Sequence, residues 1–412
     1  MTPRAAVVML LWGCSSPSGK STTTGTPTDS GLDTGTPDTD HEDELLLRAA
    51  IEGEVDAAEA LATIADRGGW PIQAESGAFL FACLCGPGTW TVAGDHDDWT
   101  GVAMTQASDL WWVELAIPEP DGSRYKFRSA DTWNADPLAR RYAHDDFGEI
   151  SLVRATSAHL ERGLAPAAYG LDARRVRVFV PQDGVFTHMV VAHDGQNLFD
   201  PHVWNGSWHL DDAVGDAPIL VVGIDNTAAR MDEYTHTTDS IGGETMGGRA
   251  ADYAELVRDV RTQMEGRYGV ADRTALMGSS LGGLVSFAIA DLQPGEWDAA
   301  LSLSGTMGWG SIGVDGETML DRYAAAGHRS TALYLDSGGS GTCVDADGDG
   351  LQDDATDASD NFCENRQFAD QLAASGYTWE ADLWHWHEPG APHSEVAWAM
   401  RVHIPLGIFA GL

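Results

Sequence analysis

The chain has 412 residues, with 63 acidic against 24 basic side chains and a formal net charge of −39. So acidic a protein is repelled by nucleic acid and by anionic membrane surfaces, which excludes both as expected partners. The length favours two domains, and a hydrophobic fraction of 43% allows each a sizeable core.

Residues 1–13 have the pattern of a short export signal. Arg4 precedes an apolar run over residues 5–12, which is too short to span a bilayer and ends in residues 11–14 (LWGC). This ending resembles the lipobox of bacterial lipoproteins. The resemblance implies cleavage before Cys14, lipidation of its thiol, and an exported, membrane-anchored protein in the outer membrane, periplasm or cell surface. An unlipidated signal or a wrongly chosen start codon is the alternative.

A polar segment follows the lipidation site. Residues 15–40 are rich in Ser, Thr, Gly, Pro and Asp and contain one apolar residue, Leu32. Such a segment cannot bury enough surface to fold, so we expect a disordered acidic tether over residues 14–44. Apolar residues near helical spacing then predict one helix over residues 42–67, which ends at Gly68 and Gly69.

Short strands separated by turn residues come next and predict a small all-β domain over residues 70–155. Together with the preceding helix it makes up a first domain over residues 45–155. Strands are expected at 79–81, 89–92, 110–115 and 125–127.

This β segment resembles the immunoglobulin-like early-set domain that precedes the catalytic domain of glycogen-branching enzymes and some esterases. The matching stretches are 92–99 (VAGDHDDW), 111–115 (WWVEL), 125–127 (YKF) and 136–137 (DP). The resemblance implies an immunoglobulin-like sandwich that binds glycan or shapes a substrate cleft through Trp99, Trp111 or Trp112. A structural spacer with these tryptophans in its core is the alternative.

From residue 160 to residue 412, apolar strands alternate with helices. Strands are expected at 175–181, 189–192, 219–224, 274–277, 299–304 and 331–335, and an amphipathic helix at 250–268. This alternation predicts an α/β domain with a mostly parallel central sheet that helices cover on both faces.

Residues 276–284 (LMGSSLGGL) carry the main chemical motif. Gly278, Ser280 and Gly282 have the G-x-S-x-G spacing of a nucleophile elbow. The serine of such a bend exposes its hydroxyl, and the glycines admit backbone that larger side chains would exclude. The helix that starts there directs its first amides at an oxyanion. Because 47 glycines make chance matches common, the position after a central strand is what gives the motif weight.

A serine nucleophile needs a general base and an acid that orients the base. In α/β-hydrolases the three follow along the chain in the order serine, acid, histidine. His393 lies in a loop before the last expected helix, where the base should be.

These features together resemble the putative-esterase family of α/β-hydrolases, which includes enterochelin esterases, feruloyl and acetylxylan esterases, S-formylglutathione hydrolase and mycolyltransferases. The matching stretches are 193–200 (HDGQNLFD), 223–226 (GIDN) with Arg230, Glu233 and Tyr234, 278–283 (GSSLGG) and 393–398 (HSEVAW). The resemblance implies Ser280 as the nucleophile, His393 as the base, and the backbone amides of Gln196 and Leu281 as the oxyanion hole.

The family places the acid just beyond the strand at 333–335, where Asp336 stands. The short Gly-Thr-x-Asp/Glu pattern of the family is absent, because residues 337–363 are expanded. We therefore predict Asp336 as the acid, with Asp345 and Asp360 as rivals.

The expansion has carboxylates at alternate positions, in the D-x-D-x-D-G pattern that opens an EF-hand-like calcium loop. The predicted ligands are Asp345, Asp347, Asp349 and Asp353. Thr356 stands where an EF-hand has its last glutamate, and Asp354 or Asp357 would substitute. We expect a structural Ca²⁺, whose removal lowers activity or stability; a solvated acidic loop is the alternative.

Two pairs of cysteines are left after Cys14. Cys343 and Cys363 bracket the expansion, and in an exported protein they are expected to form a disulfide. Cys83 and Cys85 are two residues apart, and the sequence leaves open whether they bridge or stay reduced.

The sequence thus predicts an exported, lipid-anchored serine esterase that hydrolyses carboxylic esters of a siderophore or acylated-carbohydrate type through Ser280, His393 and Asp336, without an organic cofactor. An acyltransferase that uses a sugar acceptor is one alternative. A non-catalytic, glycan-binding surface lipoprotein is the other.

Overall fold

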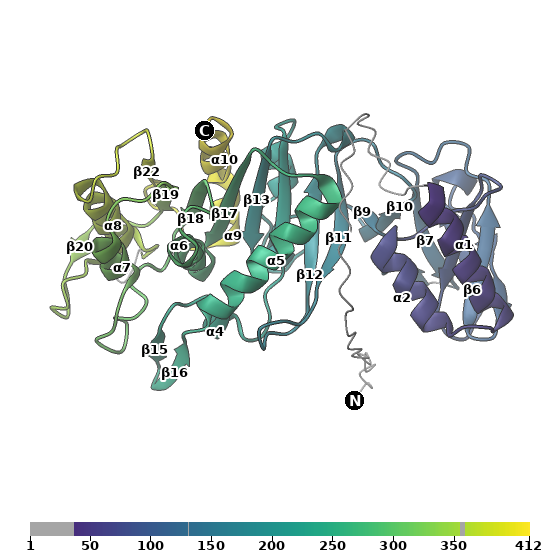
Figure 1. Ribbon diagram of the computed structural model, residues 1–412, viewed down its shortest axis with the longest axis horizontal. Coiled ribbons are helices and arrows are strands. Elements are labelled where there is room, and N and C mark those ends of the chain that lie inside the picture. Colours follow the sequence, from purple (N-terminus) through teal and green to yellow (C-terminus); the bar gives the residue numbers. More distant parts are fainter. Residues whose placement is uncertain (1–36, 131, 355–358) are drawn as a thin grey trace, which may run out of the picture. The chain divides into compact units, whose positions relative to one another are not determined.

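The computed structural model of the protein describes residues 37–130, 132–354 and 359–412 (Figure 1). The predicted signal, the lipidation site at Cys14 and the tether up to residue 36 lie outside these residues, as do Thr356 and Asp357. No helix of the described part is long and apolar enough to cross a membrane.

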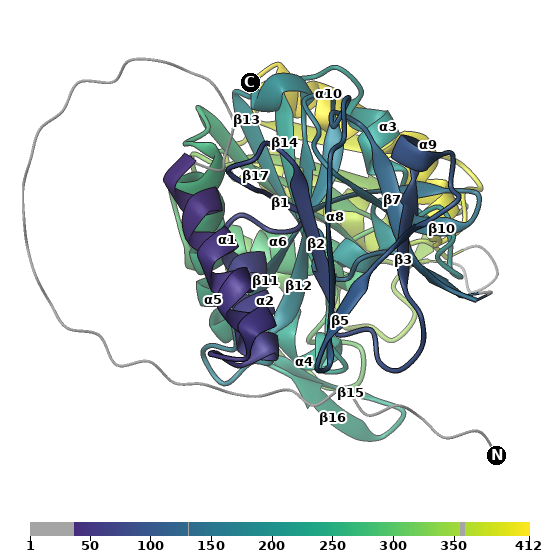
Figure 2. The same cartoon turned by 90° about the vertical axis from the view of Figure 1, so that its right-hand side faces the viewer.

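The described chain begins with two helices, α1 (Pro37–Glu52) and α2 (Ala57–Arg67), which lie side by side (Figures 1 and 2). The prediction of one helix over residues 42–67 is therefore wrong, and so is a tether that extends to residue 44. Gly53 has a φ of 77°, which ends the first helix. The Asp56 carboxylate accepts a hydrogen bond from the Glu59 amide at 2.9 Å and starts the second.

Among the described residues the main sheet has fourteen strands, in the order β22-β19-β18-β17-β13-β14-β12-β11-β9-β10-β7-β3-β4, with β8 paired to β7. Six neighbouring strands are parallel to one another: β22 (Leu383–His387), β19 (Ala332–Ser337), β18 (Ala299–Leu303), β17 (Arg273–Ser279), β13 (His188–His193) and β14 (Ile219–Ile224). The other strands are antiparallel: β12 (Arg174–Val180), β11 (His159–Ala165), β9 (Arg141–Asp145), β10 (Gly148–Leu152), β7 (Arg124–Ser129), β3 (Thr91–Gly94), β4 (Val102–Ala103) and β8 (Thr132–Asn134).

The sheet is therefore mixed, and the prediction of a mostly parallel sheet is wrong. β11 is the reason, because it pairs with β12 on one side and with β9 on the other; Leu160 lies opposite Phe179 in β12 and Tyr142 in β9. The edge that β12 would otherwise expose is covered by β11. The N-terminal strands consequently continue the sheet across the boundary predicted near residues 155–160.

A second, four-stranded sheet belongs to the N-terminal part, in the order β1 (Ile72–Gln73), β2 (Phe79–Cys83), β6 (Leu110–Leu115), β5 (Thr105–Ala107). One face packs on the N-terminal end of the main sheet, where the rings of Phe81 and Tyr125 meet edge-on at 4.8 Å. The other face packs against α1 and α2, with Leu47, Leu61 and Leu80 in one buried cluster. The predicted separate sandwich thus shares its strands with the main sheet, and its immunoglobulin-like character stays a prediction.

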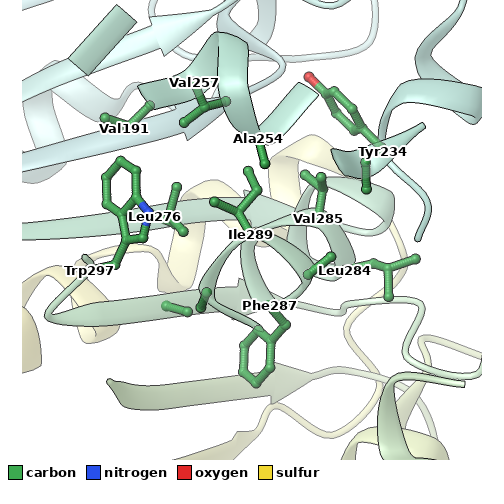
Figure 3. Packing of buried hydrophobic residues seen from close by; sticks show 14 of the residues in the cluster. Val191, Tyr234, Ala254, Val257, Leu276, Leu284, Val285, Phe287, Ile289 and Trp297 are labelled. Atoms are coloured by element: carbon green, nitrogen blue, oxygen red, sulfur yellow. The ribbon is translucent and has the colours of Figure 1, made fainter. Parts of the chain in front are cut away.

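Helices cover both faces of the parallel strands, as predicted. One face packs against α5 (Ala250–Tyr268), α6 (Leu281–Leu292), α7 (Met319–Ala326) and α8 (Phe362–Ala374), and the other against α3 (Leu210–Val214), α9 (Glu395–Arg401) and α10 (His403–Ala410). Figure 3 shows the first of these interfaces, where Leu276 of β17 and Val191 of β13 meet Val257 of α5 and Ile289 of α6. Strands buried on both faces need apolar side chains at successive positions, which β13 and β14 have.

Candidate active site

Ser280 lies at the bend between β17 and α6, with φ 55° and ψ −124°. This backbone conformation is strained for a residue with a side chain, and neighbouring glycines permit it. A Cβ on Gly278 would lie 2.5 Å from the backbone carbon of Gly282, so no larger residue fits there. The Ser280 amide donates to the Leu303 carbonyl at 3.0 Å, which fixes the bend against β18. The predicted elbow is therefore present.

His393 lies in the loop before α9, whose first turn is capped by the Ser394 hydroxyl. Its Nδ1 is 2.7 Å from the Asp360 Oδ1, and the Trp398 ring lies edge-on 4.9 Å away. An ionised carboxylate can only accept a hydrogen bond, so we assign a proton to His393 Nδ1, which is the donor. The Nε2 is then the basic nitrogen, and the side chain is 35% exposed to take a proton.

The Asp360 side chain is fully buried and has a partner for each oxygen. Oδ1 faces His393, while Oδ2 accepts hydrogen bonds from the Ser304 hydroxyl at 2.7 Å and the Gly338 amide at 2.5 Å. An Arg401 Nη2 lies 3.3 Å from the same oxygen. These contacts hold the carboxylate in one orientation, which a residue that orients a catalytic histidine requires.

Asp336 does not contact His393, so the prediction that it orients the histidine is wrong. It lies within β19, one residue before the strand ends, and its side chain turns to the buried Arg401, whose Nε is 3.0 Å from Oδ1. The Tyr334 hydroxyl donates to the other oxygen at 3.1 Å. The loop after β19 passes over the strand ends instead and brings Asp360 to the histidine.

Asp354 holds the backbone around Asp360 in place. Its Oδ2 accepts hydrogen bonds from the amides of Asp360 at 3.0 Å and Phe362 at 2.9 Å, and its Oδ1 from the Cys363 amide at 2.7 Å. The predicted disulfide between Cys343 and Cys363 is present, beside the short hairpin β20 (Cys343–Val344) and β21 (Asp353–Asp354). One carboxylate and one disulfide therefore help to hold the backbone that carries Asp360.

Two backbone amides are predicted to form the oxyanion hole. Gln196 lies in the short 3-10 helix η3 (Gly195–Asn197) and Leu281 is the first residue of α6. Amides in the first turn of a helix have no carbonyl partner within that helix, so both can donate to an oxyanion.

Asp194, just before Gln196, fixes the loop that carries this amide. It has a left-handed φ of 59°, and its two oxygens accept hydrogen bonds from Arg230 at 2.8 Å each. The side-chain amide of Asn226 donates to Asp194 Oδ1 at 2.6 Å, and the backbone amide of Asn226 donates to the side-chain oxygen of Gln196 at 3.1 Å. These contacts explain why residues 193–200 and 223–230 occur together in the sequence motif.

Ser280 and His393 approach the same edge of the sheet, although no hydrogen bond joins their side chains within the described part of the chain. Ser280 bonds to Leu303 at the end of β18, and the next residue, Ser304, donates to Asp360 and accepts from Trp398 Nε1 at 3.0 Å. Catalytic hydrogen bonds are often long or absent without substrate and form in the substrate complex.

The predicted calcium ligands are only partly brought together. Carboxylate oxygens of Asp345, Asp347 and Asp353 lie within 4.8 Å of one another on the surface, and three carboxylates suit a hard cation such as Ca²⁺. Asp349 is not in this group, and its carboxylate accepts a hydrogen bond from the Ser311 hydroxyl. The prediction of Asp349 as a fourth ligand stays a prediction.

The tryptophans singled out for glycan binding do not form one surface. Trp111 and Trp112 are neighbours in β6 and so point to opposite faces. Trp111 is buried and donates to the Gly86 carbonyl at 3.1 Å, while Trp112 packs toward α1 and α2. Trp99 donates to Asp95 at 3.2 Å. Cys83 and Cys85, left open above, form a disulfide at the edge of this region.

The largest of the cavities described, about 710 Å³, lies in the N-terminal part between Trp90, Trp133 and Phe147 and does not include Ser280. The serine is half-buried at an open edge of the sheet. The candidate active site is therefore identified by the residues around Ser280 and not by a large cavity.

A protein-family model described as "Putative esterase" matches residues 171–402, more than half of the chain. The chain belongs to this family. Membership of this family identifies it as an ester-hydrolysing enzyme. A comparison with curated protein sequences found no match.

Solved structures similar to this chain come from other esterases and hydrolases. The enterobactin esterase Fes of Shigella flexneri is 15% identical with a TM-score of 0.43, over 81% of this chain and 92% of that one. An IroE-like serine hydrolase of Shewanella oneidensis is 18% identical with a TM-score of 0.47, over 60% and 78%. The siderophore hydrolase EstB of Aspergillus nidulans is 16% identical with a TM-score of 0.41, over 61% and 95%.

Proposed function

We propose that the protein is a serine hydrolase that cleaves carboxylic esters with Ser280 as nucleophile, His393 as general base and Asp360 as the acid that orients the base. The observation that carries this proposal is the 2.7 Å hydrogen bond between His393 Nδ1 and Asp360 Oδ1, together with a serine on a strained elbow at the end of β17. The same arrangement on unrelated folds performs acyl transfer.

The proposed chemistry follows from these positions. His393 Nε2 takes the proton of the Ser280 hydroxyl as its oxygen attacks the ester carbonyl. The amides of Gln196 and Leu281 bind the negative oxygen of the tetrahedral intermediate, a contribution of about 3 kcal/mol or more for each well-placed donor. His393 then protonates the leaving alcohol, and a water molecule activated by the same nitrogen releases the acid from Ser280.

We further propose an exported protein anchored through a lipid on Cys14. The sequence of residues 1–14 supports this location. Disulfides persist in oxidising compartments, so the pairs Cys83–Cys85 and Cys343–Cys363 are also in keeping with export. We propose esters of the siderophore or acylated-carbohydrate type as substrates, as the resemblance to the family implies.

The test is labelling with a fluorophosphonate probe together with hydrolysis of p-nitrophenyl acetate and a series of longer esters. We expect the probe to label the wild type and a Ser279→Ala control, which changes the neighbouring buried serine. We expect Ser280→Ala to be neither labelled nor active. Absence of labelling and of hydrolysis in the wild type would reject the proposal and favour a non-catalytic protein. Adding a sugar acceptor and analysing it for acylation separates hydrolysis from acyl transfer.

A further inference from the structure

A buried polar network lies directly behind the pair of His393 and Asp360, and the triad as proposed does not use all of it. Its members come from the ends of β18 and β19, from the loop after β19 and from α9, and each is at most 2% exposed. They are Ser304, Asp336, Asp360 and Arg401.

The guanidinium of Arg401 is shared unequally between the two carboxylates. Its Nε is 3.0 Å from Asp336 Oδ1, whereas its Nη2 is 3.3 Å from Asp360 Oδ2. The same Nη2 donates at 2.6 Å to the Ser304 hydroxyl, whose own proton goes to Asp360. Arg401 therefore contacts both carboxylates, with the shorter distance to Asp336, and it also reaches Asp360 through a serine.

The net charge of this network and His393 together depends on whether His393 is protonated. Two carboxylates and one guanidinium carry one net negative charge while His393 is neutral. When His393 takes the proton of the nucleophile, the buried group becomes neutral as a whole. Unbalanced charge is costly away from water, so this arrangement favours the protonated histidine that the reaction must form.

We propose that Asp336 is a positioning residue of the active site: it shares the guanidinium of Arg401 with Asp360, so that the network keeps one net negative charge, which favours protonation of His393. The inference rests on the proposed triad of Ser280, His393 and Asp360. It gives the carboxylate nearest the strand end a role different from the one that its position in the sequence suggested.

The groups that face Asp336 are few. They are Arg401 from α9, the Tyr334 hydroxyl from β19 and the Ser304 amide at 3.2 Å from the end of β18. Burial raises the pKa of Asp336 to about 6, although Arg401 opposes the shift. The ion pair with Arg401 favours the ionised form of Asp336. His393 faces Asp360 and the Trp398 ring.

The experiment follows the His393 ring by NMR in the inactive Ser280→Ala background, so that it needs no esterase activity. The ring signal is assigned by its loss in His393→Gln. Asp336→Asn removes one negative charge and keeps the shape, and we expect it to move the titration of the His393 ring to lower pH by about half a unit to one unit. Tyr334→Phe removes a hydrogen bond to Asp336 without changing its charge, and we expect it to move the titration much less.

A double variant makes the test independent of how well Asp336→Asn folds. Arg401→Gln leaves two uncompensated carboxylates and should move the His393 titration to higher pH. Combining it with Asp336→Asn restores one net negative charge and should return the titration toward that of the parent. The inference is wrong, and Asp336 is only structural, if two results are both absent. These are a His393 titration at lower pH in Asp336→Asn than in the parent, and one at lower pH in the double variant than in Arg401→Gln alone.

In the active enzyme the same substitution should shift the acid limb of the pH–rate profile to lower pH. The proposed function fails separately, because a wild type without esterase activity would still give an interpretable His393 titration.

Discussion

The proposed active site combines two structurally different parts. The strand-edge part lies at the carboxyl ends of β17 and β13, and the other part is the expanded loop after β19. Ser280 and the loop at Asp194 follow directly from β17 and β13, and short motifs with glycines at fixed positions shape them. Asp360 lies instead near the end of the long expansion after β19, where a disulfide and the Asp354 carboxylate help to hold it. The first part sits on strand ends that the core of the sheet holds, whereas the second is held by one disulfide and by polar contacts of a surface loop.

This difference also separates their expected sensitivities. A strand-edge residue is held by the core of the sheet, so changes near it should alter chemistry more than folding. The expansion has little core of its own, and loss of one covalent or polar contact there should release Asp360 from its position. The predictions below test this contrast, from the largest expected effect to the smallest.

The largest effect is expected from His393, on which both parts converge. His393→Gln removes the proposed base, and we expect kcat/KM to fall on the order of 10⁴-fold or more, as for the catalytic histidines of serine hydrolases. The side chain is partly exposed, so folding should be retained by circular dichroism. His403→Gln, at an exposed position of α10, is the matched control and should keep full activity. A His393→Gln variant with more than a tenth of the wild-type rate would contradict the assignment.

The disulfide between Cys343 and Cys363 tests the expansion alone. It closes a loop with a sequence separation of 20, and removing it as the double serine variant should lower the free energy of unfolding of this part by about 3 kcal/mol. Because Asp360 lies three residues before Cys363, activity should fall with it.

The bridge between Cys83 and Cys85 is the control for this prediction, because its sequence separation is only 2. Its removal should leave activity unchanged and lower the melting temperature less, since little chain is constrained. Equal losses of activity in the two double variants would show that the expansion does not hold Asp360 as described.

Arg230 tests the strand-edge part. Its two hydrogen bonds to Asp194 fix the loop that carries the Gln196 amide, so Arg230→Ala should lower kcat by about 10- to 100-fold, with a smaller change in KM. Arg230→Lys keeps the charge but not the paired hydrogen bonds and should recover only part of the rate. Arg249→Ala, on a half-buried arginine that pairs with Asp252 and has no contact with Asp194 in the described residues, should have no effect on kcat. A change confined to KM would argue against a role at the oxyanion.

The smallest effect is expected from calcium, which we propose to bind between Asp345, Asp347 and Asp353. At a concentration ten times its dissociation constant, an ion stabilises the native state by about 1.4 kcal/mol. We therefore expect millimolar Ca²⁺ to raise the melting temperature relative to EDTA, and Asp345→Asn with Asp353→Asn to abolish that difference. The same response in the wild type and in this double variant would reject the site.

The contrast between the two parts also explains what could be predicted from the sequence. Periodicity predicted the boundaries of α5 and β14 because burial on a helix face or in a sheet leaves a local pattern. Fixed glycine spacing did the same for Ser280. The break at Gly53 was missed because apolar spacing continues on both sides of it, and the connection between α1 and α2 is only the short segment 53–56, with Gly53 at a positive φ and Asp56 as the cap.

Pairing between distant segments left no such pattern. Nothing in the composition of β11 indicated that it pairs with β9 and joins the N-terminal strands to the main sheet. Likewise, Asp336 lies within β19 and Asp360 in the loop after it, and the sequence does not show which of the two faces His393. In the fold, Asp336 is bound by Arg401 within the core, whereas Asp360 is held at the histidine by partners from other segments.

The identity of the acid is the central claim, and a comparison of two isosteric variants tests it most directly. We expect Asp360→Asn to lower kcat/KM by about 10³- to 10⁴-fold, since the histidine loses the partner that fixes its tautomer. Asp336→Asn should lower the plateau rate by no more than about tenfold and mainly shift the acid limb. A larger loss for Asp336→Asn than for Asp360→Asn, with both variants folded, would contradict the account.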